Sequence, residues 1–269
     1  MKREYAVLGM VILFIVGGLA GWLIPTFLTT PQAQTPLLDQ IQSRGYINVG
    51  TSADYPPFEN KTYPGGEIIG FDIDISQWIA DEIGVTLQMV DMDFDSLIGA
   101  CQAGTIDMIA AAMTYTPTRA EQIDPSITYI TSSSVVIVKN SSSLTITSLD
   151  NLTSYTVGVQ SGTVMQQELE DLGMTLGVDL LAYPRATDLM QNLDLGTVQA
   201  VYVDGPIFTA YSSTYNIKVI YSSEPDPLAF WVRHGQPTLL YQVNKVIFDS
   251  YQDGSMFSLI DKWFGNATT

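Results

Sequence analysis

Apolar positions in this chain recur with two different periods, and the two patterns follow each other along the sequence. Short β-branched runs at 46–51 and 85–91 flank a stretch at 71–84 in which apolar residues recur every three or four positions. The runs are typical of buried strands, and the stretch between them is typical of an amphipathic helix. This strand–helix–strand order predicts an α/β fold.

The alternation continues beyond residue 91 and starts again near residue 155. The further predicted segments are a helix at 95–103, a strand at 106–111, an extended stretch at 127–139, strands at 156–160, 180–183, 199–204 and 217–223, helices at 163–172 and 187–195, and terminal helices at 237–252 and 254–264. The proline-rich residues 224–227 are expected to follow the end of the last of these strands.

The length of 269 residues favours two lobes, since single hydrophobic cores stop growing at about 250–300 residues. The terminal helices have no lobe of their own, so we expect them to return to the first lobe. The predicted fold class is therefore a two-lobe α/β fold with a two-strand hinge. Its first lobe comprises 44–135 and 228–269, and its second lobe comprises 136–227.

The N-terminal residues 1–28 predict a transmembrane anchor or a signal segment. An uncharged apolar stretch at 5–24 follows Lys2 and Arg3 and is long enough to span about 30 Å of hydrocarbon. Positive residues before it predict a cytoplasmic N-terminus and an extracellular remainder. A cleaved signal peptide is the alternative, although its apolar region normally runs about 7–15 residues. Residues 29–43 then form a tether.

Charge and composition exclude several classes of function. A net charge of −17 with only 11 Lys and Arg residues argues against a nucleic-acid partner. One histidine and one cysteine cannot build a zinc site from imidazole and thiolate ligands. Asp91, Asp93 and Asp95 lack the glycine and glutamate of a calcium loop, so we expect them to cap the next helix. No metal or other cofactor is expected.

The loop after the first predicted strand carries candidate ligand contacts. It contains Ser52, Tyr55 and Phe58, with two prolines between the aromatic residues. Loops at strand ends bind ligands in α/β folds, and the prolines hold this loop rigid. We expect Tyr55 to contact a ligand and Phe58 to belong to the core.

Arg119 lies where a strand ends and a short helix begins. A threonine cap and a proline at an early helical position are expected there. The guanidinium of Arg119 could bind a carboxylate through two hydrogen bonds, with Thr114 adding donors. The alternative is a surface ion pair with Glu121 or Asp124.

The second half of the chain offers a complementary group. Gly162 would allow a ligand to approach backbone amides closely. Asp204 ends a predicted strand and could accept hydrogen bonds from an ammonium group. The alternative role for Asp204 is that of a helix cap ahead of Pro206.

Several segments together resemble the polar-amino-acid branch of bacterial and archaeal extracellular solute-binding proteins, the receptors of ATP-driven importers. They occur in the family's order over residues 44–265 and read RGYINVGTSADYPPFE, IIGFDIDISQWIADEIG, FDSLIGACQAGTIDMIAAAMTYTPTR, TVGVQSGT, AVYVDGP and VNKVIFDSYQDGSMFSLIDKWFG. The resemblance implies a periplasmic-binding-protein fold and a monomer. It also implies a receptor that delivers a small amino acid to the membrane permease of an ABC transporter.

The resemblance implies roles for individual residues at the two charged ends of an amino acid. Arg119, assisted by Thr114 and the amide of Thr163, would pair with the α-carboxylate. Asp204 and backbone near Ala112 would receive the α-ammonium.

The resemblance also implies the groups that meet the rest of the ligand. Tyr55 and Phe94 would be the stacking aromatics. Ser52 and Gln160 stand where binders of basic amino acids carry charged residues. A neutral side chain is therefore the expected specificity.

The sequence predicts a binding protein and not an enzyme. It carries no Gly-x-Ser-x-Gly elbow, Walker loop or His-Glu-x-x-His motif. One alternative is an enzyme on the same fold, similar to cyclohexadienyl dehydratase, but no acid or base for its cleft stands out. Another is a sensory ectodomain that signals through a separate membrane partner.

Overall fold

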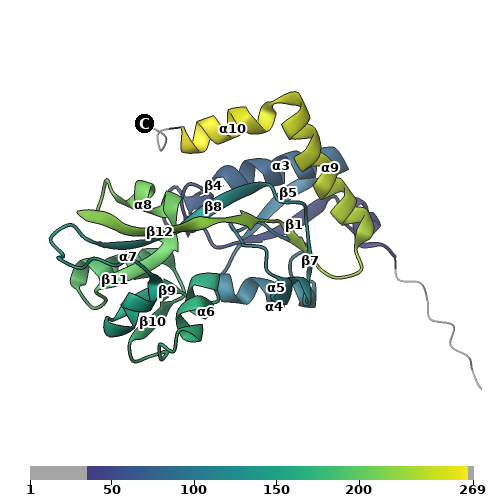
Figure 1. The fold of residues 1–269 in the computed structure, drawn as a ribbon. Coiled ribbons are helices and arrows are strands. Elements are labelled where there is room, and N and C mark those ends of the chain that lie inside the picture. Colours follow the sequence, from purple (N-terminus) through teal and green to yellow (C-terminus); the bar gives the residue numbers. More distant parts are fainter. Residues whose placement is uncertain (1–34, 266–269) are drawn as a thin grey trace, which may run out of the picture. The chain divides into compact units, whose positions relative to one another are not determined.

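The computed structural model describes residues 35–265 of the chain (Figure 1). These residues form two α/β lobes, each built around a five-stranded sheet. The membrane segment predicted at 1–28 lies outside the described residues, as do residues 29–34 of the predicted tether. The tether prediction is wrong for residues 37–43, because they belong to helix α2 (Leu37–Arg44), which buries Leu37 and Ile41. Within residues 35–265 no helix is long and apolar enough to cross a membrane.

The sheet of the first lobe combines parallel and antiparallel pairs. Its strands, in spatial order, are β5 (Thr86–Asp91), β1 (Tyr46–Thr51), β6 (Met108–Ile109), β13 (Trp231–Val232) and β7 (Asp124–Pro125). β1 is parallel to β5 and β6, whereas β13 is antiparallel to β6 and β7. β6 is shorter than the strand predicted at 106–111, because β13 offers partners for only two residues.

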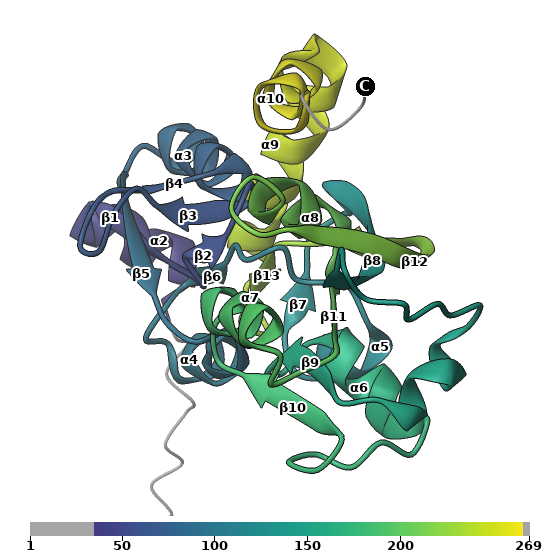
Figure 2. The same cartoon turned by 90° about the vertical axis from the view of Figure 1, so that its left-hand side faces the viewer.

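Helices cover both faces of this sheet. One face packs against α2 (Leu37–Arg44), α3 (Phe71–Ile83), α9 (Pro237–Asp253) and α10 (Ser255–Phe264), and the other packs against α4 (Leu97–Ala103). Met108 joins the first apolar cluster and its neighbour Ile109 joins the second, because successive strand residues point to opposite faces. α3 and α4 accordingly lie on opposite sides of β1 (Figure 2). The terminal helices thus pack on the first lobe.

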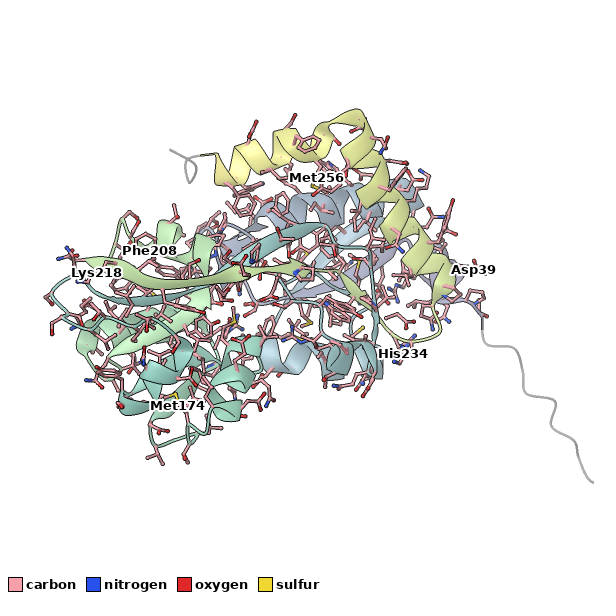
Figure 3. All side chains as sticks on the ribbon, in the orientation of Figure 1. Asp39, Met174, Phe208, Lys218, His234 and Met256 are labelled. Atoms are coloured by element: carbon pink, nitrogen blue, oxygen red, sulfur yellow. The ribbon has the colours of Figure 1, made fainter. Side chains whose placement is uncertain are left out.

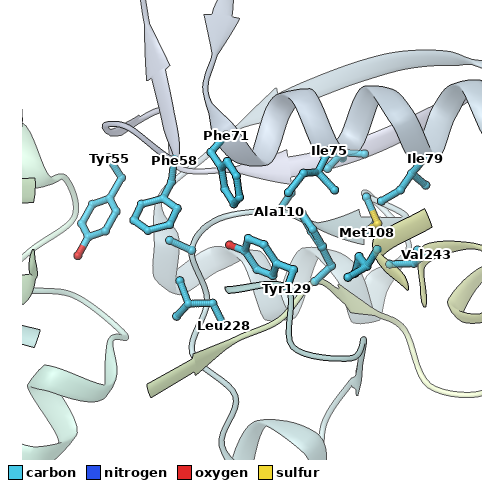
Figure 4. Close-up of a cluster of buried hydrophobic side chains, with 14 of the residues drawn as sticks. Tyr55, Phe58, Phe71, Ile75, Ile79, Met108, Ala110, Tyr129, Leu228 and Val243 are labelled. Carbon is cyan, nitrogen blue, oxygen red and sulfur yellow. The ribbon is translucent and has the colours of Figure 1, made fainter. Parts of the chain in front are cut away.

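A small antiparallel sheet extends the first lobe beside the loop after β1. It contains β2 (Asp54–Tyr55), β3 (Glu59–Lys61) and β4 (Ile68–Ile69). Tyr55 lies opposite Glu59 in this sheet. Phe58 is 1% exposed in the core, as predicted. Tyr55 stands at the end of the same row of aromatic side chains, with its hydroxyl turned away from Phe58 (Figure 4).

The second lobe is built on a sheet in which β8 runs antiparallel to the other four strands. In spatial order they are β10 (Leu180–Tyr183), β9 (Val157–Gln160), β11 (Ala200–Asp204), β8 (Ile130–Lys139) and β12 (Ile217–Leu228). The helices of this lobe are α6 (Val164–Asp171), α7 (Ala186–Leu195), α8 (Gly205–Tyr211) and the short η2 (Leu149–Ser154). Met174 belongs to an apolar cluster of this lobe, and Met256 belongs to the cluster that includes α10. The two methionines lie far apart in the molecule (Figure 3).

The described chain passes between the two sheets from β7 to β8 and again from β12 to β13. β12 does not end at residue 223, and that prediction is wrong. It continues through the proline-rich residues to Leu228, with Pro225 opposite Ser133 and Pro227 opposite Thr131. Because β12 lies at the edge of its sheet, a proline there removes no interior ladder bond.

Candidate ligand-binding site

A cavity lies between the lobes, at the carboxyl ends of strands from both sheets. The residues around it leave about 300 Å³ of space not filled by atoms, part of which is open to solvent. All nine residues selected from the sequence line it: Ser52, Tyr55, Phe94, Ala112, Thr114, Arg119, Gln160, Thr163 and Asp204. Residues that no sequence pattern had singled out complete the lining: Glu59, Ala111, Val164 and Met165.

Arg119 is held at the cavity by the short helix α5 (Pro117–Ala120). The side chain of Thr116 caps this helix by accepting a hydrogen bond from the backbone N–H of Arg119, and Pro117 occupies the first turn, as predicted. The alternative of a surface ion pair is wrong, since Arg119 is only 7% exposed. Asp124 instead pairs with His234.

The guanidinium of Arg119 connects both lobes. Nη1 donates to the carbonyl of Thr114 at 2.7 Å, and Nη2 donates to the carbonyl of Gly162 in the second lobe at 3.0 Å. Its carbon atom lies 5.6 Å from the centre of the Phe94 ring. Burial lowers the pKa of Arg119 to about 10, while the charge of Asp204 acts in the opposite direction. Arg119 therefore remains a cation at neutral pH.

Asp204 faces the cavity from the end of β11. It occupies the N-cap position of α8, but its side chain makes no capping hydrogen bond, so the alternative role of a helix cap does not hold. Its carboxylate accepts a hydrogen bond of 2.8 Å from the hydroxyl of Tyr55. Burial raises the pKa of Asp204 to about 6, and the hydrogen bond from Tyr55 opposes this rise.

Ala112 brings the backbone of the first lobe to the cavity in an unusual conformation. Its φ is +46°, a left-handed value that is uncommon outside glycine. The N–H of Ala112 donates to Asp72 at 2.8 Å, and the hydroxyl of Tyr129 donates to the same oxygen of Asp72 at 2.9 Å. These two bonds hold the turn in place, although burial still raises the pKa of Asp72 to about 7.

Polar contacts join the lobes on the remaining sides of the cavity. The amide nitrogen of Gln160 donates to the hydroxyl of Ser52 at 3.3 Å and to the carbonyl of Pro184 at 3.2 Å. Thr163 caps α6 and donates its hydroxyl to the carbonyl of Gln160 at 2.7 Å. Gly162 adopts φ +78°, and a Cβ added there would lie 2.9 Å from Cα of Asp95 across the cleft.

The aspartates after β5 have a different role from the one predicted. They were expected to cap the helix that follows, but Asp93 makes no side-chain capping bond at the start of η1 (Phe94–Ser96). Instead, Arg185 of the second lobe donates to Asp93 at 2.8 Å and to Asp91 at 2.6 Å. Since the aspartates and Arg185 are about ninety residues apart, no local spacing shows their pairing.

Asp54 adds a further link beside this ion-pair cluster. Its carboxylate accepts hydrogen bonds from the N–H of Thr187 at 2.9 Å and from the hydroxyl of Thr187 at 3.1 Å. Together with Arg185, Thr187 ties the start of α7 to the first lobe from outside the cavity. In residues 35–265 no group of His, Cys, Asp or Glu side chains is arranged to hold a metal ion.

Glu59 is the most informative of the residues that sequence reasoning missed. It is 0% exposed, and its side chain lines the cavity. The one available signal was its position directly after the buried Phe58. A glutamate in a loop is normally solvated, so that position alone did not indicate a buried carboxyl.

The fold and the cavity define a two-lobed α/β protein with a polar site between its lobes. A family model described as bacterial extracellular solute-binding proteins, family 3, matches residues 47–266. The chain belongs to this family.

Relatives and a solved structure agree with this assignment. The arginine-binding extracellular protein ArtP of Bacillus subtilis (strain 168) is 30% identical over 220 residues, covering 80% of this chain and 85% of that protein. The L-cystine-binding protein TcyJ of Escherichia coli (strain K12) is 27% identical over 267 residues, covering 98% and 96%. A crystal structure of the substrate binding protein of an amino acid ABC transporter matches with a TM-score of 0.75 and 39% identity, covering 82% of this chain and 100% of that chain.

Proposed function

We propose that this protein is an extracellular receptor that encloses an α-amino acid between its lobes and delivers it to an ABC-type importer. The observation that carries the proposal is that Arg119 and Asp204, one from each lobe, face the same small cavity. A cationic fork and a carboxylate at two ends of one cavity complement the two charges of a zwitterion.

Closure of the lobes follows from this division of charges. The carboxylate of the ligand would replace the backbone carbonyls as a partner of the Arg119 guanidinium. The ammonium of the ligand would donate hydrogen bonds to the carboxylate of Asp204, which accepts a hydrogen bond from Tyr55 in the structure. Either lobe alone binds one end of the ligand, so the ligand favours the closed state over the open one. Closure also excludes water, which strengthens both charged contacts.

The importer and the extracellular location are supported by the family and by the relatives. The family is one of extracellular proteins, and the matching solved structure is described as part of an amino acid ABC transporter. The apolar stretch at 5–24 supports attachment to the membrane, with the lobes outside. A membrane permease is the proposed partner.

Two charge states of the ligand's side chain, neutral and cationic, each have support from the cavity. Ser52 and Gln160 are uncharged and favour a neutral side chain, and a cystine-binding relative is consistent with that. Glu59 faces the same cavity and favours a cationic side chain, and an arginine-binding relative is consistent with that.

A thermal-shift screen of the full-length chain against the twenty amino acids tests the receptor function. A ligand at about 100 times its Kd stabilises the folded state by about 2.7 kcal/mol. We expect a shift with a small subset of the amino acids, and the Arg119→Ala variant should lose it. A wild-type chain that responds to none of the twenty contradicts the proposal.

An enzyme similar to cyclohexadienyl dehydratase is the second candidate. The observation in its favour is Glu59, a buried carboxyl in the cavity whose pKa is raised by burial and which can therefore carry a proton for transfer. Incubation with prephenate or arogenate decides between the two, since only the enzyme forms a product.

A further inference from the structure

Four Asn-X-Ser/Thr tripeptides occur in the sequence, beginning at Asn60, Asn140, Asn151 and Asn266. With any residue except proline in the middle, such a sequon can accept an N-linked glycan in a chain that leaves the cytoplasm. The tripeptide is short enough to recur by chance, so the sequence alone does not say which asparagine is modified. Asn266 lies outside the described residues, but the structure separates the other three.

Asn140 lies in the turn that follows β8, at the tip of the second lobe. It is exposed, and its backbone N–H donates to the carbonyl of Asn216 at 2.9 Å. Within residues 35–265 its side-chain amide makes no hydrogen bond. Lys218, which donates to the carbonyl of Ser142 in the same sequon at 2.8 Å, marks this tip in Figure 3. The amide nitrogen of Asn140 is therefore accessible.

The chain around Asn140 is irregular from the end of β8 to the start of η2. Residues 140–148 contain no helix or strand, and the hydroxyl of Ser142 accepts a hydrogen bond only from the nearby N–H of Leu144, at 3.1 Å. Exposed loop tips are the preferred sites of proteolytic cleavage, because an enzyme can reach their backbone. The same access allows a transferase to bind this sequon.

Asn151 is also exposed, but its side chain already has a structural role. Its Oδ1 accepts hydrogen bonds from the N–H of Thr147 at 3.0 Å and from the N–H of Ser148 at 3.3 Å, at the start of η2. The hydroxyl of Thr153, the third residue of this sequon, donates to the carbonyl of Asp150 at 2.8 Å. Both side chains would have to give up these bonds to enter a transferase, so this sequon is the weaker acceptor.

Asn60 is held on both sides within the small antiparallel sheet. It lies in β3, the middle strand, opposite Asp54 of β2 and Ile69 of β4. It is half-buried, and the preceding residue, Glu59, lines the ligand cavity. A transferase could reach this backbone only after the sheet had opened, so Asn60 is a poor acceptor in the folded chain.

We infer that Asn140 carries an N-linked glycan, in preference to Asn60 and Asn151. Nδ2 of Asn140 forms a bond to C1 of the first sugar of an oligosaccharide that a lipid pyrophosphate activates. The C1–O bond to the pyrophosphate breaks, the lipid pyrophosphate leaves with the bonding electrons, and the proton lost from Nδ2 passes to a base of the transferase. Nothing is oxidised or reduced. The inference rests on the proposed extracellular location, since the transfer takes place outside the cytoplasm.

The glycan would lie away from the ligand cavity. Ser134 of β8 is opposite Asp204, which lines the cavity, and Asn140 follows Ser134 by six residues. At about 3.4 Å for each strand residue, these six residues span roughly 20 Å. A glycan at the tip of the second lobe therefore leaves room for the lobes to close around a ligand.

Mass spectrometry of the full-length chain from the cells that produce it tests the inference. Cleavage after lysine and before aspartate gives peptides 54–61, 140–149 and 150–170, each with one of the three asparagines. Peptide 140–149 should carry the mass of an oligosaccharide, and the other two should have the mass of their sequence alone. An unmodified peptide 140–149 overturns the inference, and so does a glycan on either of the other two peptides in its place.

Variants produced in the same cells identify the acceptor atom. Asn140→Gln should lose the glycan, and so should Ser142→Ala, which removes the hydroxyl that the sequon requires. Ser141→Ala changes only the middle residue of the sequon and is the matched control that should keep the glycan. A glycan that persists in Asn140→Gln is attached to a neighbouring hydroxyl and overturns the inference. The wild-type peptide masses stand without any variant, should one fail to fold.

Two further measurements separate this inference from the receptor proposal. A membrane-impermeant amine label applied to intact cells should react with the chain, and a chain that stays unlabelled overturns the extracellular location and the glycan together. Asn140→Gln should bind the best amino acid as tightly as the wild-type chain, and a loss of binding overturns the placement of the glycan away from the cavity. A wild-type chain that binds no amino acid overturns the receptor function and leaves the glycan on Asn140 intact.

Discussion

The hydroxyl of Tyr55 lies 2.8 Å from a carboxylate oxygen of Asp204, and this hydrogen bond joins the first lobe to the second across the ligand cavity. The backbone N–H of Asp204 in turn donates to the same hydroxyl at 3.2 Å. The group proposed to bind the ligand's ammonium is therefore already held by an uncharged partner. This partner also keeps the pKa of Asp204 from rising further.

Replacing Tyr55 with Phe should shift the pH dependence of ligand binding upward. Asp204 must be ionised to accept an ammonium group, so affinity is lost as pH falls through its pKa of about 6. Without the hydroxyl this pKa rises, and the loss begins at a higher pH. Affinity for the best amino acid, measured against pH in both chains, checks this. Coinciding profiles would show that Tyr55 does not tune Asp204.

Replacing Arg119 with Ala should abolish most of the binding energy. Removing one partner of a buried charge pair costs about 3–5 kcal/mol, and Arg119 is the cationic group that we assign to the ligand's carboxylate. Calorimetric titration with the best amino acid gives the loss directly. Lys262→Ala, which removes a positive charge from an exposed site on α10, is the matched control and should bind normally. An unchanged affinity in Arg119→Ala would refute its assignment.

Replacing Gly162 with Ala should prevent full closure. The added Cβ would lie 2.9 Å from Cα and Cβ of Asp95 in the other lobe, and the φ of +78° adds backbone strain. Gly177→Ala introduces a similar strain at φ +80° with no atom within 4 Å of the added Cβ, which makes it the control. Both variants should lose about 1–2 kcal/mol of folding stability. Only Gly162→Ala should also lose affinity; an equal loss in both would rule out steric hindrance of closure.

Replacing Arg185 with Gln should open the lobes in the absence of ligand. Arg185 pairs with Asp91 and Asp93 of the first lobe, and its side chain is 25% exposed, so solvent screens the pairs only in part. Such partly exposed pairs contribute up to about 1 kcal/mol each. Small-angle X-ray scattering should show a larger radius of gyration for the variant, and for the wild-type chain at high salt. Insensitivity to both changes would exclude an ionic contribution to closure.

Much of the fold could be predicted because its signals are local. The strands predicted at 46–51 and 180–183 coincide with β1 and β10. Short runs of β-branched and aliphatic residues are typical of strands, so the local sequence was enough to place them. The helix predicted at 71–84 ends at Ile83, because Gly84 adopts a left-handed conformation and caps it. Thr114, Arg119 and Asp204 were predictable for a related reason, because strand ends and helix starts place polar groups at a common edge. Phe94 and Ala112 were expected at the site only because of the resemblance to the family.

Other features depended on contacts between distant parts of the chain. β12 runs on through two prolines only because it lies at a sheet edge, and edge position is a property of the assembled sheet. Arg185 meets Asp91 only when the lobes come together. Glu59 follows Phe58 in a segment that reads as an ordinary loop. Burial turns its carboxyl from a solvated charge into a group that lines the cavity, and burial is determined by tertiary packing, which local sequence periodicity does not encode.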